Sequence, residues 1–268
     1  MISHPNCKIN IGLHVTGKRP DGYHNIETVF YPVPLCDRLE IVRSGQFEFT
    51  QEGIPIGGDA EQNLCVKAYR LLERDFPQIS PVHIHLTKNI PFGAGLGGGS
   101  SDAAFVLKML NTIFPLGLSE DQLQEYARTL GADCAFFIRN SPVYASQRGD
   151  VMEPYSLDLS GYRLVLMKPS CGVSTAEAYR ELTPRAGKVR LQEALQEPLT
   201  HWRNTIENHF EETVFRQHPE IAYLKQLLYD RGALYAAMSG SGSTVFGVFK
   251  KIPELPDMEE VISYVLTL

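Results

Sequence analysis

The chain has 268 residues, of which 43% are hydrophobic and 21% are charged, so it has enough apolar side chains for a packed core and is not disordered. Its formal net charge of -6 excludes a surface built to neutralise the phosphates of a nucleic acid. The length favours two domains, and neither an apolar run of about 18 residues nor a signal peptide is visible, so we expect no membrane partner.

The number and spacing of the cysteines indicate their redox state. The cysteines are odd in number, lie far apart, and form neither a Cys-x-x-Cys pair nor a Cys/His cluster at zinc-ligand spacing. This pattern predicts reduced, mostly buried thiols. Because no signal peptide is visible, we expect a cytoplasmic protein. The residues concerned are Cys7, Cys36, Cys65, Cys134 and Cys171.

β-Rich stretches open the chain, and the first fifty residues predict a meander of strands bounded by glycine, proline or aspartate. These strands are expected at 8–15, 25–33, 38–43 and 46–51. Apolar residues at helical spacing then predict a helix at 62–76, and strict alternation predicts a half-buried strand at 82–87. His83 and His85 share one face of that strand, and without a third ligand in register we expect them to be surface or hydrogen-bonded side chains.

The remaining elements alternate between helices and strands without parallel-sheet repeats, which favours an α+β fold. We place a domain boundary near residue 155, which gives domains 1–155 and 156–268. Helices are expected at 103–110, 119–131, 175–182, 202–215, 219–230 and 258–266. Strands are expected at 143–155, 163–167, 234–238 and 244–249.

The most informative segment is the glycine-rich run PFGAGLGGGSSDAA at 91–104. So many glycines cost backbone entropy, so they persist where the chain needs positive φ or a close approach to its main chain. The run leads directly into a helix, whose free N–H groups and dipole favour an anion such as a phosphate. Ser100 and Ser101 add hydroxyls that can cap the helix, bind a phosphate oxygen or meet Mg²⁺. The alternative is a flexible surface turn with a good helix cap.

Other phosphate-binding motifs fit this run less well. No Gly-Lys-Ser or Gly-Lys-Thr closes it as in a Walker A loop, and the chain lacks the His-Arg-Asp and Asp-Phe-Gly motifs of protein kinases. Gly93, Gly95 and Gly98 satisfy G-x-G-x-x-G, which keeps a dinucleotide-binding oxidoreductase open. The surrounding elements favour that function less, because the region that should end a strand, 118–121, reads as a helix cap.

The run resembles the P-x-x-x-G-L-G-S-S-A-A signature of the GHMP kinase superfamily, with the serine pair displaced by two extra glycines. SGSGS at 239–243 is similar to the third, glycine-rich motif of that superfamily. KINI at 8–11, GKRPDGYH at 17–24 and LGAD at 130–133 resemble the branch that phosphorylates 4-diphosphocytidyl-2-C-methyl-D-erythritol in non-mevalonate isoprenoid biosynthesis. The resemblance extends from residue 5 to about residue 250.

The resemblance implies a two-domain α+β GHMP kinase fold. Its N-terminal ATP-binding domain would be ribosomal-protein-S5-domain-2-like, and its C-terminal domain a ferredoxin-like α/β-plait. The implied reaction moves the γ-phosphoryl group of ATP to the 2-hydroxyl of the methylerythritol unit. Mg²⁺ would arrive with ATP, keep several waters and touch a loop serine, so no metal site made of protein ligands is expected.

The resemblance also assigns site residues by position, with Lys8 and Asp133 as the catalytic pair. ATP would be bound by Pro91, Phe92, Gly93, Ala94, Gly95, Leu96, Gly97, Gly98, Gly99, Ser100 and Ser101, with Asn63 in the nucleoside pocket. The acceptor would be bound by Asn10, Tyr23, His24, Thr175 and Tyr179, and the backbone of Gly240, Ser241 and Gly242 would close over the substrate diphosphate or the ATP tail.

The implied roles suit the chemistry of these residue types. An aspartate can orient the acceptor hydroxyl and take its proton late, and a lysine keeps it ionised and neutralises phosphoryl charge. An aromatic ring stacks on a nucleobase, and an imidazole supplies directional hydrogen bonds. The chain departs from the family where Cys134-Ala135 follows the aspartate in place of Val-Pro, and where Tyr179 stands for phenylalanine.

Each of these residues also has a purely structural interpretation. Asp133 after Gly-Ala is typical of a helix cap, and Lys8 in a strand is typical of a solvated edge charge. Tyr23 and His24 could form a turn with an aromatic plug, and 239–243 could be a plain hairpin loop.

Several functions therefore stay open alongside the favoured kinase. A GHMP kinase for homoserine, mevalonate or a sugar would leave Tyr23 and His24 without a reason. A dinucleotide oxidoreductase would require binding of NAD(P), and a non-catalytic nucleotide sensor would bind ATP without turnover. A monomer and a homodimer are both compatible with the sequence.

Overall fold

The computed structural model describes all residues, 1–268, and has the expected α+β composition. By Cα packing the chain divides into two units, each made of several segments. The first unit contains Met1–Lys8, Leu35–Phe92 and Gly97–Ser141, and the second contains Ile9–Pro34, Gly93–Leu96 and Pro142–Leu268. The domain boundary near residue 155 stays a prediction. No helix has both the length and the apolar character needed to cross a bilayer.

The first unit is built on a four-stranded sheet with the order β1-β4-β6-β5, formed by β1 (Ile2–Ser3), β4 (Arg38–Arg43), β6 (Val82–Lys88) and β5 (Glu48–Gly53). β5 lies parallel to β6, because the helical segment between them supplies the long crossover that parallel strands require. The predicted meander of the first fifty residues is therefore wrong, since its strands are divided between two sheets.

Strand β6 shows the predicted alternation. Its apolar residues are buried, while His83 and His85 lie half-buried on the other face. Thr50 Oγ1 lies 2.7 Å from Nε2 of His83 and 2.8 Å from Nδ1 of His85. The prediction that the two histidines are satisfied side chains is confirmed.

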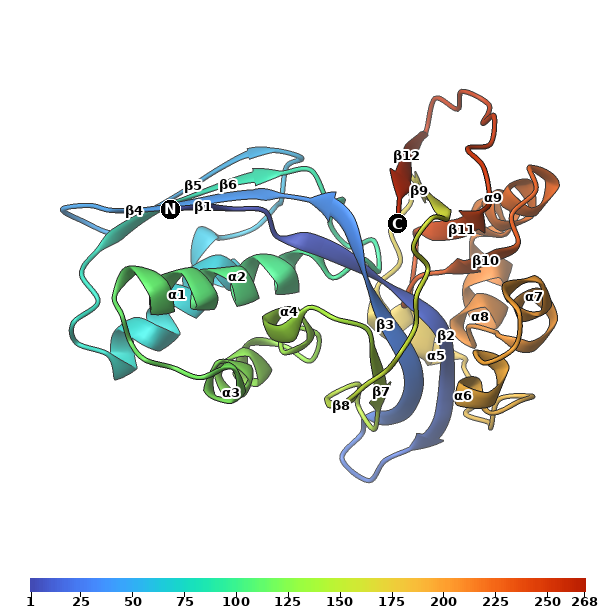
Figure 1. Ribbon diagram of the computed structural model, residues 1–268, viewed down its shortest axis with the longest axis horizontal. Coiled ribbons are helices and arrows are strands. Elements are labelled where there is room, and N and C mark those ends of the chain that lie inside the picture. The colour runs from blue at the N-terminus through green and yellow to red at the C-terminus, as the bar shows by residue number, and fades with distance from the viewer. The chain divides into compact units, whose positions relative to one another are not determined.

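Helices lie on one side of this sheet (Figure 1). They are η1 (Ala60–Gln62), α1 (Leu64–Asp75), α2 (Gly98–Ile113), α3 (Glu120–Leu130) and α4 (Phe136–Arg139), and α3 and α4 pack on α2. Asn63 caps α1 by accepting a hydrogen bond from the backbone of Cys65, and Ser119 forms a capping box with Gln122. These caps explain why the helix starts could be predicted to within a few residues.

A cluster of buried charges ties this sheet to α2. The ammonium group of Lys88 contacts the carboxylates of Asp37 and Asp102, 2.9 Å from Oδ2 of the latter, and all three residues are at most 2% exposed. Asp37 also accepts backbone hydrogen bonds from Asn89 and Ile90. Burial raises the pKa of Asp102 and outweighs the opposing effect of Lys88. Two carboxyl groups thus share one cation at the end of β6.

The second unit contains most of one sheet and all of another. The first has the order β2 (Asn6–Lys18), β3 (His24–Cys36), β7 (Val143–Ser146) and β8 (Val151–Pro154). The other is antiparallel and has the order β10 (Tyr235–Met238), β11 (Val245–Phe249), β9 (Arg163–Pro169) and β12 (Val261–Thr267). Leu13 and Val15 of β2 belong to the same apolar core as Met167, Phe210 and Met238.

The helices of the second unit are α5 (Thr175–Arg180), α6 (Leu191–Ala194), η2 (Leu199–His201), α7 (Trp202–Thr205), α8 (Phe210–Gln217) and α9 (Pro219–Asp230). α9 packs against β10 and β11 (Figure 1). The five cysteines of the chain are free, three buried and two half-buried, as expected.

Two predicted helices are wrong. The expected helix 202–215 is broken at 206–209, where the side chain of Asn208 donates hydrogen bonds to the carbonyls of Met238 and Gly240. The expected helix 258–266 is the edge strand β12, which pairs with β9 along its whole length. Pairing with a buried strand outweighs the local helical pattern of this segment.

His14 gives the fold a predictable response to acid. It is 1% exposed, stacks on His209 at 4.9 Å, and neither of its ring nitrogens has a hydrogen-bond partner. Burial and the neighbouring His209 lower its pKa to about 4, whereas Glu207 opposes and Arg185 adds to the shift. The unfolded chain therefore binds a proton that the folded chain rejects.

We expect the free energy of unfolding to be highest above pH 6.5. Protonation of His14 in the unfolded chain should lower it by about 3 kcal/mol between pH 6.5 and pH 4. Urea unfolding over this pH range measures the loss. His14→Phe should flatten the dependence, and the same change at the exposed His4 should not. An unchanged pH profile in His14→Phe would contradict this role.

Candidate active site

Lys8 and Asp133 lie together, as predicted. Lys8 is in β2 and 3% exposed, and its Nζ lies 3.3 Å from Oδ2 of Asp133. The carboxylate follows the end of α3 at Gly131, and its side chain is 33% exposed. The solvated edge charge considered for Lys8 is therefore wrong. A buried cation faces a carboxylate that a second molecule can still reach.

The start of α2 follows Gly97, which has a φ of 70° and offers no side-chain cap. The first backbone N–H groups of this helix are therefore available to an anion. A side chain at Gly97 would meet Cε of Lys8 at 3.2 Å, so the lysine passes beside the loop on its way to Asp133. The hydroxyl of Ser101, one turn further, is buried without a hydrogen-bond partner.

The earlier part of the glycine-rich run, Gly93–Leu96, belongs to the second unit. There the carbonyl of Gly95 accepts a hydrogen bond of 2.9 Å from the hydroxyl of Ser239, and the carbonyl of Ala94 accepts one of 3.3 Å from the backbone of Thr244. The backbone N–H of Asn10 in turn donates to the Ser239 hydroxyl at 3.2 Å. The first and third glycine-rich motifs are thus linked through one serine.

Gly95 permits this close approach. It has a φ of +74°, and a Cβ at this position would lie 2.0 Å from the carbonyl oxygen of Ser239. We expect Gly95→Ala to move the loop and to lower kcat/KM for ATP by about 10²-fold. Steady-state kinetics at varied ATP measures this loss. The matched control is Gly117→Ala, which has a φ of +71° but open space, and it should leave kcat/KM unchanged. Equal losses of kcat/KM in both variants would show that backbone strain, and not the contact with Ser239, causes the effect.

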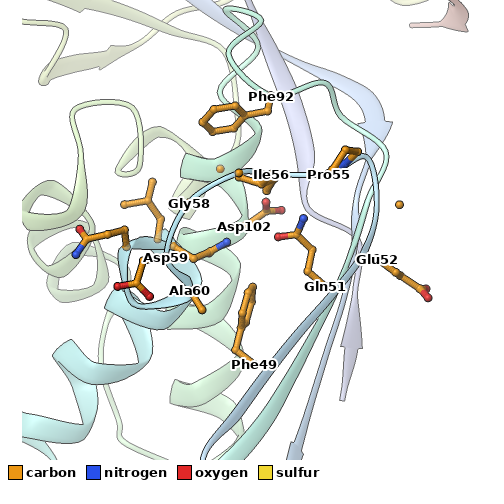
Figure 2. Close-up of a pocket in the computed structure, with 16 residues that line it drawn as sticks. Phe49, Gln51, Glu52, Pro55, Ile56, Gly58, Asp59, Ala60, Phe92 and Asp102 are labelled. Carbon is orange, nitrogen blue, oxygen red and sulfur yellow. The ribbon is translucent and has the colours of Figure 1, made fainter.

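A cavity of about 750 Å³ lies in the first unit beside the glycine-rich loop. Figure 2 shows Phe92 at one end of it, Phe49 of β5 at the other, and Asp102 between them. The predicted ATP residues Asn63, Phe92 and Gly99 line the cavity. Segment 55–60, which closes one side of the cavity, was not predicted as part of the site, although Gly-Ile-Pro-Ile-Gly-Gly at 53–58 was a visible loop signal.

Five of the predicted acceptor residues form two pairs and a single tyrosine. The ring of His24 stacks on Tyr179 at 4.5 Å, and the hydroxyls of Thr175 and Ser241 lie 3.3 Å apart. Tyr23 is 60% exposed on the Asp-Gly turn, with the guanidinium of Arg148 5.4 Å from its ring centroid. The aromatic plug considered for Tyr23 is therefore wrong, because this ring faces solvent.

Asn10 supports the third glycine-rich motif. Its side-chain amide donates to Thr28 at 3.0 Å, and a Cβ at Gly240 would lie 3.3 Å from its Oδ1. Gly240 and Gly242 have φ values of 58° and 92°, as expected for a loop that presents its backbone. The plain β-hairpin interpretation does not explain the bonds that this loop makes with Gly95 and Asn10.

Asn208 and Ser239 are two positions that the sequence analysis did not single out as site residues. Both are buried, and both hold glycine-rich backbone in place through the hydrogen bonds given above. The role of Asn208 could not be predicted from a motif, because it follows no glycine and lies inside an apparent helical pattern. Ser239 was visible as the first residue of the SGSGS motif.

The chain is similar to known proteins over nearly its whole length. Residues 63–141 match the model of the GHMP kinases N terminal domain, and residues 190–265 match that of the GHMP kinases C terminal domain. The 4-diphosphocytidyl-2-C-methyl-D-erythritol kinase of Bacteroides thetaiotaomicron is 53% identical over 263 residues, which cover 97% of this chain and 96% of that protein. The Chlorobium phaeobacteroides protein of the same name is 39% identical, covering 96% and 91%.

The chain belongs to the GHMP kinases and, within them, to the 4-diphosphocytidyl-2-C-methyl-D-erythritol kinases. A crystal structure of 4-(cytidine 5'-diphospho)-2C-methyl-D-erythritol kinase superposes with a TM-score of 0.81 at 33% identity, covering 92% of this chain and 90% of that one. The Methanococcus jannaschii mevalonate kinase, 12% identical and covering 100% and 98%, shares the fold with a TM-score of 0.71.

Membership of the GHMP kinases makes the chain an enzyme that uses ATP as co-substrate. It confirms the expected GHMP kinase fold and decides against the dinucleotide oxidoreductase that the G-x-G-x-x-G spacing had left open.

Proposed function

We propose that this kinase transfers the γ-phosphoryl group of ATP to the 2-hydroxyl of 4-diphosphocytidyl-2-C-methyl-D-erythritol, in the non-mevalonate route to isoprenoids, and that Lys8 and Asp133 are its catalytic pair. The main support for the catalytic pair is that the buried ammonium group of Lys8 lies beside the start of α2 and 3.3 Å from the Asp133 carboxylate. The identity of 49–54% to bacterial relatives that bear the name of this kinase supports the choice of acceptor.

The proposed chemistry needs one base and one fixed cation. The acceptor oxygen forms its bond to the γ-phosphorus as the bond to ADP breaks, and Oδ2 of Asp133 takes the hydroxyl proton. Its carboxylate is 33% exposed and can pass that proton to water. The ammonium group of Lys8 holds the carboxylate in position and neutralises charge on the transferred group.

For ATP, we propose that the phosphates lie on the backbone between Pro91 and Ser101 and that the nucleoside occupies the cavity lined by Asn63 and Phe92. Mg²⁺ would enter with ATP, and the residues present fit it, because the Ser101 hydroxyl is buried without a hydrogen-bond partner. The ion would neutralise charge on the phosphates.

For the acceptor, we propose that the cytosine ring is recognised at the stack of His24 and Tyr179. Burial and Lys18 lower the pKa of His24, so its imidazole stays neutral at pH 7 and carries one N–H donor and one acceptor. Asn10, Tyr23, Thr175 and the backbone of Gly240, Ser241 and Gly242 would complete this subsite. The same proposal divides the chain into an ATP-binding domain, 1–155, and a second domain, 156–268.

The test is ADP release by the purified protein with MgATP and different acceptors. We expect turnover with 4-diphosphocytidyl-2-C-methyl-D-erythritol and background rates with homoserine, mevalonate or no acceptor. Turnover with another acceptor would remove the roles of Tyr23, His24 and Tyr179. ATP binding without turnover on any acceptor would contradict the proposed catalytic pair and favour a nucleotide sensor.

A further inference from the structure

A cluster of metal-ligating side chains lies in the second unit, whereas Lys8 and Asp133 belong to the first. Cys171 follows β9, and His218 and Glu220 lie where α8 ends and α9 begins. One ligand atom from each of the three residues lies within 4.8 Å of the others. Two of these side chains are half-buried and the third is exposed, so an ion can enter from solvent. Cys171 is far from His218 and Glu220 in sequence, which explains why no motif indicated the three together.

The histidine is held in the orientation that a ligand needs. Its Nε2 lies 3.0 Å from Oε1 of Glu177 in α5, and its Nδ1 lies 3.5 Å from Oε1 of Glu220. A carboxylate on one ring nitrogen fixes the tautomer and directs the other nitrogen toward a metal. The sulfur of Cys171 lies within 4.8 Å of the ligand atoms of His218 and Glu220, so sulfur, nitrogen and oxygen converge.

The spacing matches the coordination sphere of zinc. With bonds of about 2.0–2.2 Å to nitrogen and oxygen, a tetrahedral zinc ion holds these two ligand atoms about 3.4 Å apart. The observed separation of Nδ1 of His218 and Oε1 of Glu220 is 3.5 Å. A thiolate, an imidazole and a carboxylate are ligands that zinc accepts, and three of them leave one coordination position open.

We propose that Cys171, His218 and Glu220 form a binding site for a zinc-type divalent ion, with Glu177 as the positioning residue of the histidine. The bound ion connects the loop after β9 to the junction of α8 and α9. Binding releases the thiol proton to solvent, because the thiolate is the ligand form of cysteine. Nothing is oxidised or reduced in this step.

The ion would act on a segment with a proposed role in acceptor binding. The carbonyl of Cys171 accepts hydrogen bonds of 2.7 Å from Ser243 and 2.9 Å from Lys168. Ser243 ends the third glycine-rich motif, and α5, which carries Thr175 and Tyr179, starts four residues after Cys171. An ion that fixes Cys171 therefore holds the end of the third glycine-rich motif and the start of α5.

The experiment titrates the full chain with Co²⁺ as a spectroscopic probe, under a reductant that contains no thiol. We expect one Co²⁺ per chain, with a thiolate-to-cobalt charge-transfer band and tetrahedral d–d bands that Zn²⁺ removes by displacement. Cys171→Ala should abolish the charge-transfer band, and Glu177→Gln should weaken Co²⁺ binding by about 10- to 100-fold. Zn²⁺ should also raise the Tm of the parent chain and not that of Cys171→Ala.

The matched control is Cys36→Ala, which removes the other half-buried thiol and should keep both bands. Glu220→Gln changes an exposed side chain and tests the site if Cys171→Ala fails to fold. A charge-transfer band that survives Cys171→Ala, or that Cys36→Ala removes, would place the ion elsewhere. The absence of any charge-transfer band in the folded parent chain at millimolar Co²⁺ would overturn the proposal. These outcomes are independent of kinase activity, so they stand apart from the acceptor assay.

Discussion

Asp133→Asn is expected to lower kcat by about 10²- to 10⁴-fold, because the amide cannot take the proton of the acceptor hydroxyl. The side chain is one-third exposed, so loss of the carboxylate leaves no cavity and little strain. Lys8 keeps a polar neighbour in this variant, since the amide oxygen of asparagine can still accept from its ammonium group. The measurement is steady-state ADP release at saturating ATP and acceptor.

The control for this variant is Asp121→Asn, which removes another carboxylate paired with a cation, Arg139, in an exposed position. We expect its kcat to match that of the parent protein, and both variants to unfold at the parent's urea midpoint. Near-normal turnover in folded Asp133→Asn would leave Asp133 as a helix-end residue without a catalytic role.

Lys88→Met is expected to lower the free energy of unfolding by about 3–5 kcal/mol, because it leaves Asp37 and Asp102 buried without their cation. A methionine nearly matches the lysine in length, so packing changes little and the loss reports the charge. Urea or guanidinium unfolding measures it directly.

Two variants separate charge from packing in this cluster. Lys67→Met removes an exposed lysine that bonds only Gln62 and should cost less than about 1 kcal/mol. Lys88→Met combined with Asp102→Asn removes one of the two carboxyl groups and should recover part of the stability. A loss below about 1 kcal/mol in Lys88→Met alone would mean that the buried carboxyl groups simply take up protons.

Local patterns predicted the elements whose limits are set by their own residues. α1 and α3 begin at side chains that cap their first turn, Asn63 and Ser119, and α9 begins at Pro219, which suits the first helical position. The Lys8–Asp133 pair was predicted only through the family resemblance, because contact between residues this far apart depends on the whole fold.

The errors occur where distant parts of the chain decide the conformation. Residues 261–267 carry a pattern compatible with a helix, and their strand form depends on β9, which begins about a hundred residues earlier. Asn208 interrupts a helical run because its amide binds two carbonyls of the β10 region. Neither partner can be identified from the neighbouring sequence. The break at Asn208 also holds a glycine-rich loop of the candidate site in place.

The second unit is assembled from segments near both ends of the chain, which has a consequence for synthesis on the ribosome. Leu13 and Val15 pack in a core with residues from β10 and β11, which are made roughly 220 residues later. At about 5–20 residues per second, the apolar face of β2 waits about 10–45 s for these partners. The first unit receives its last segment by Ser141 and can fold in the meantime. The apolar face of β2 therefore stays uncovered for most of synthesis, and we expect chaperones that bind exposed apolar segments to bind there.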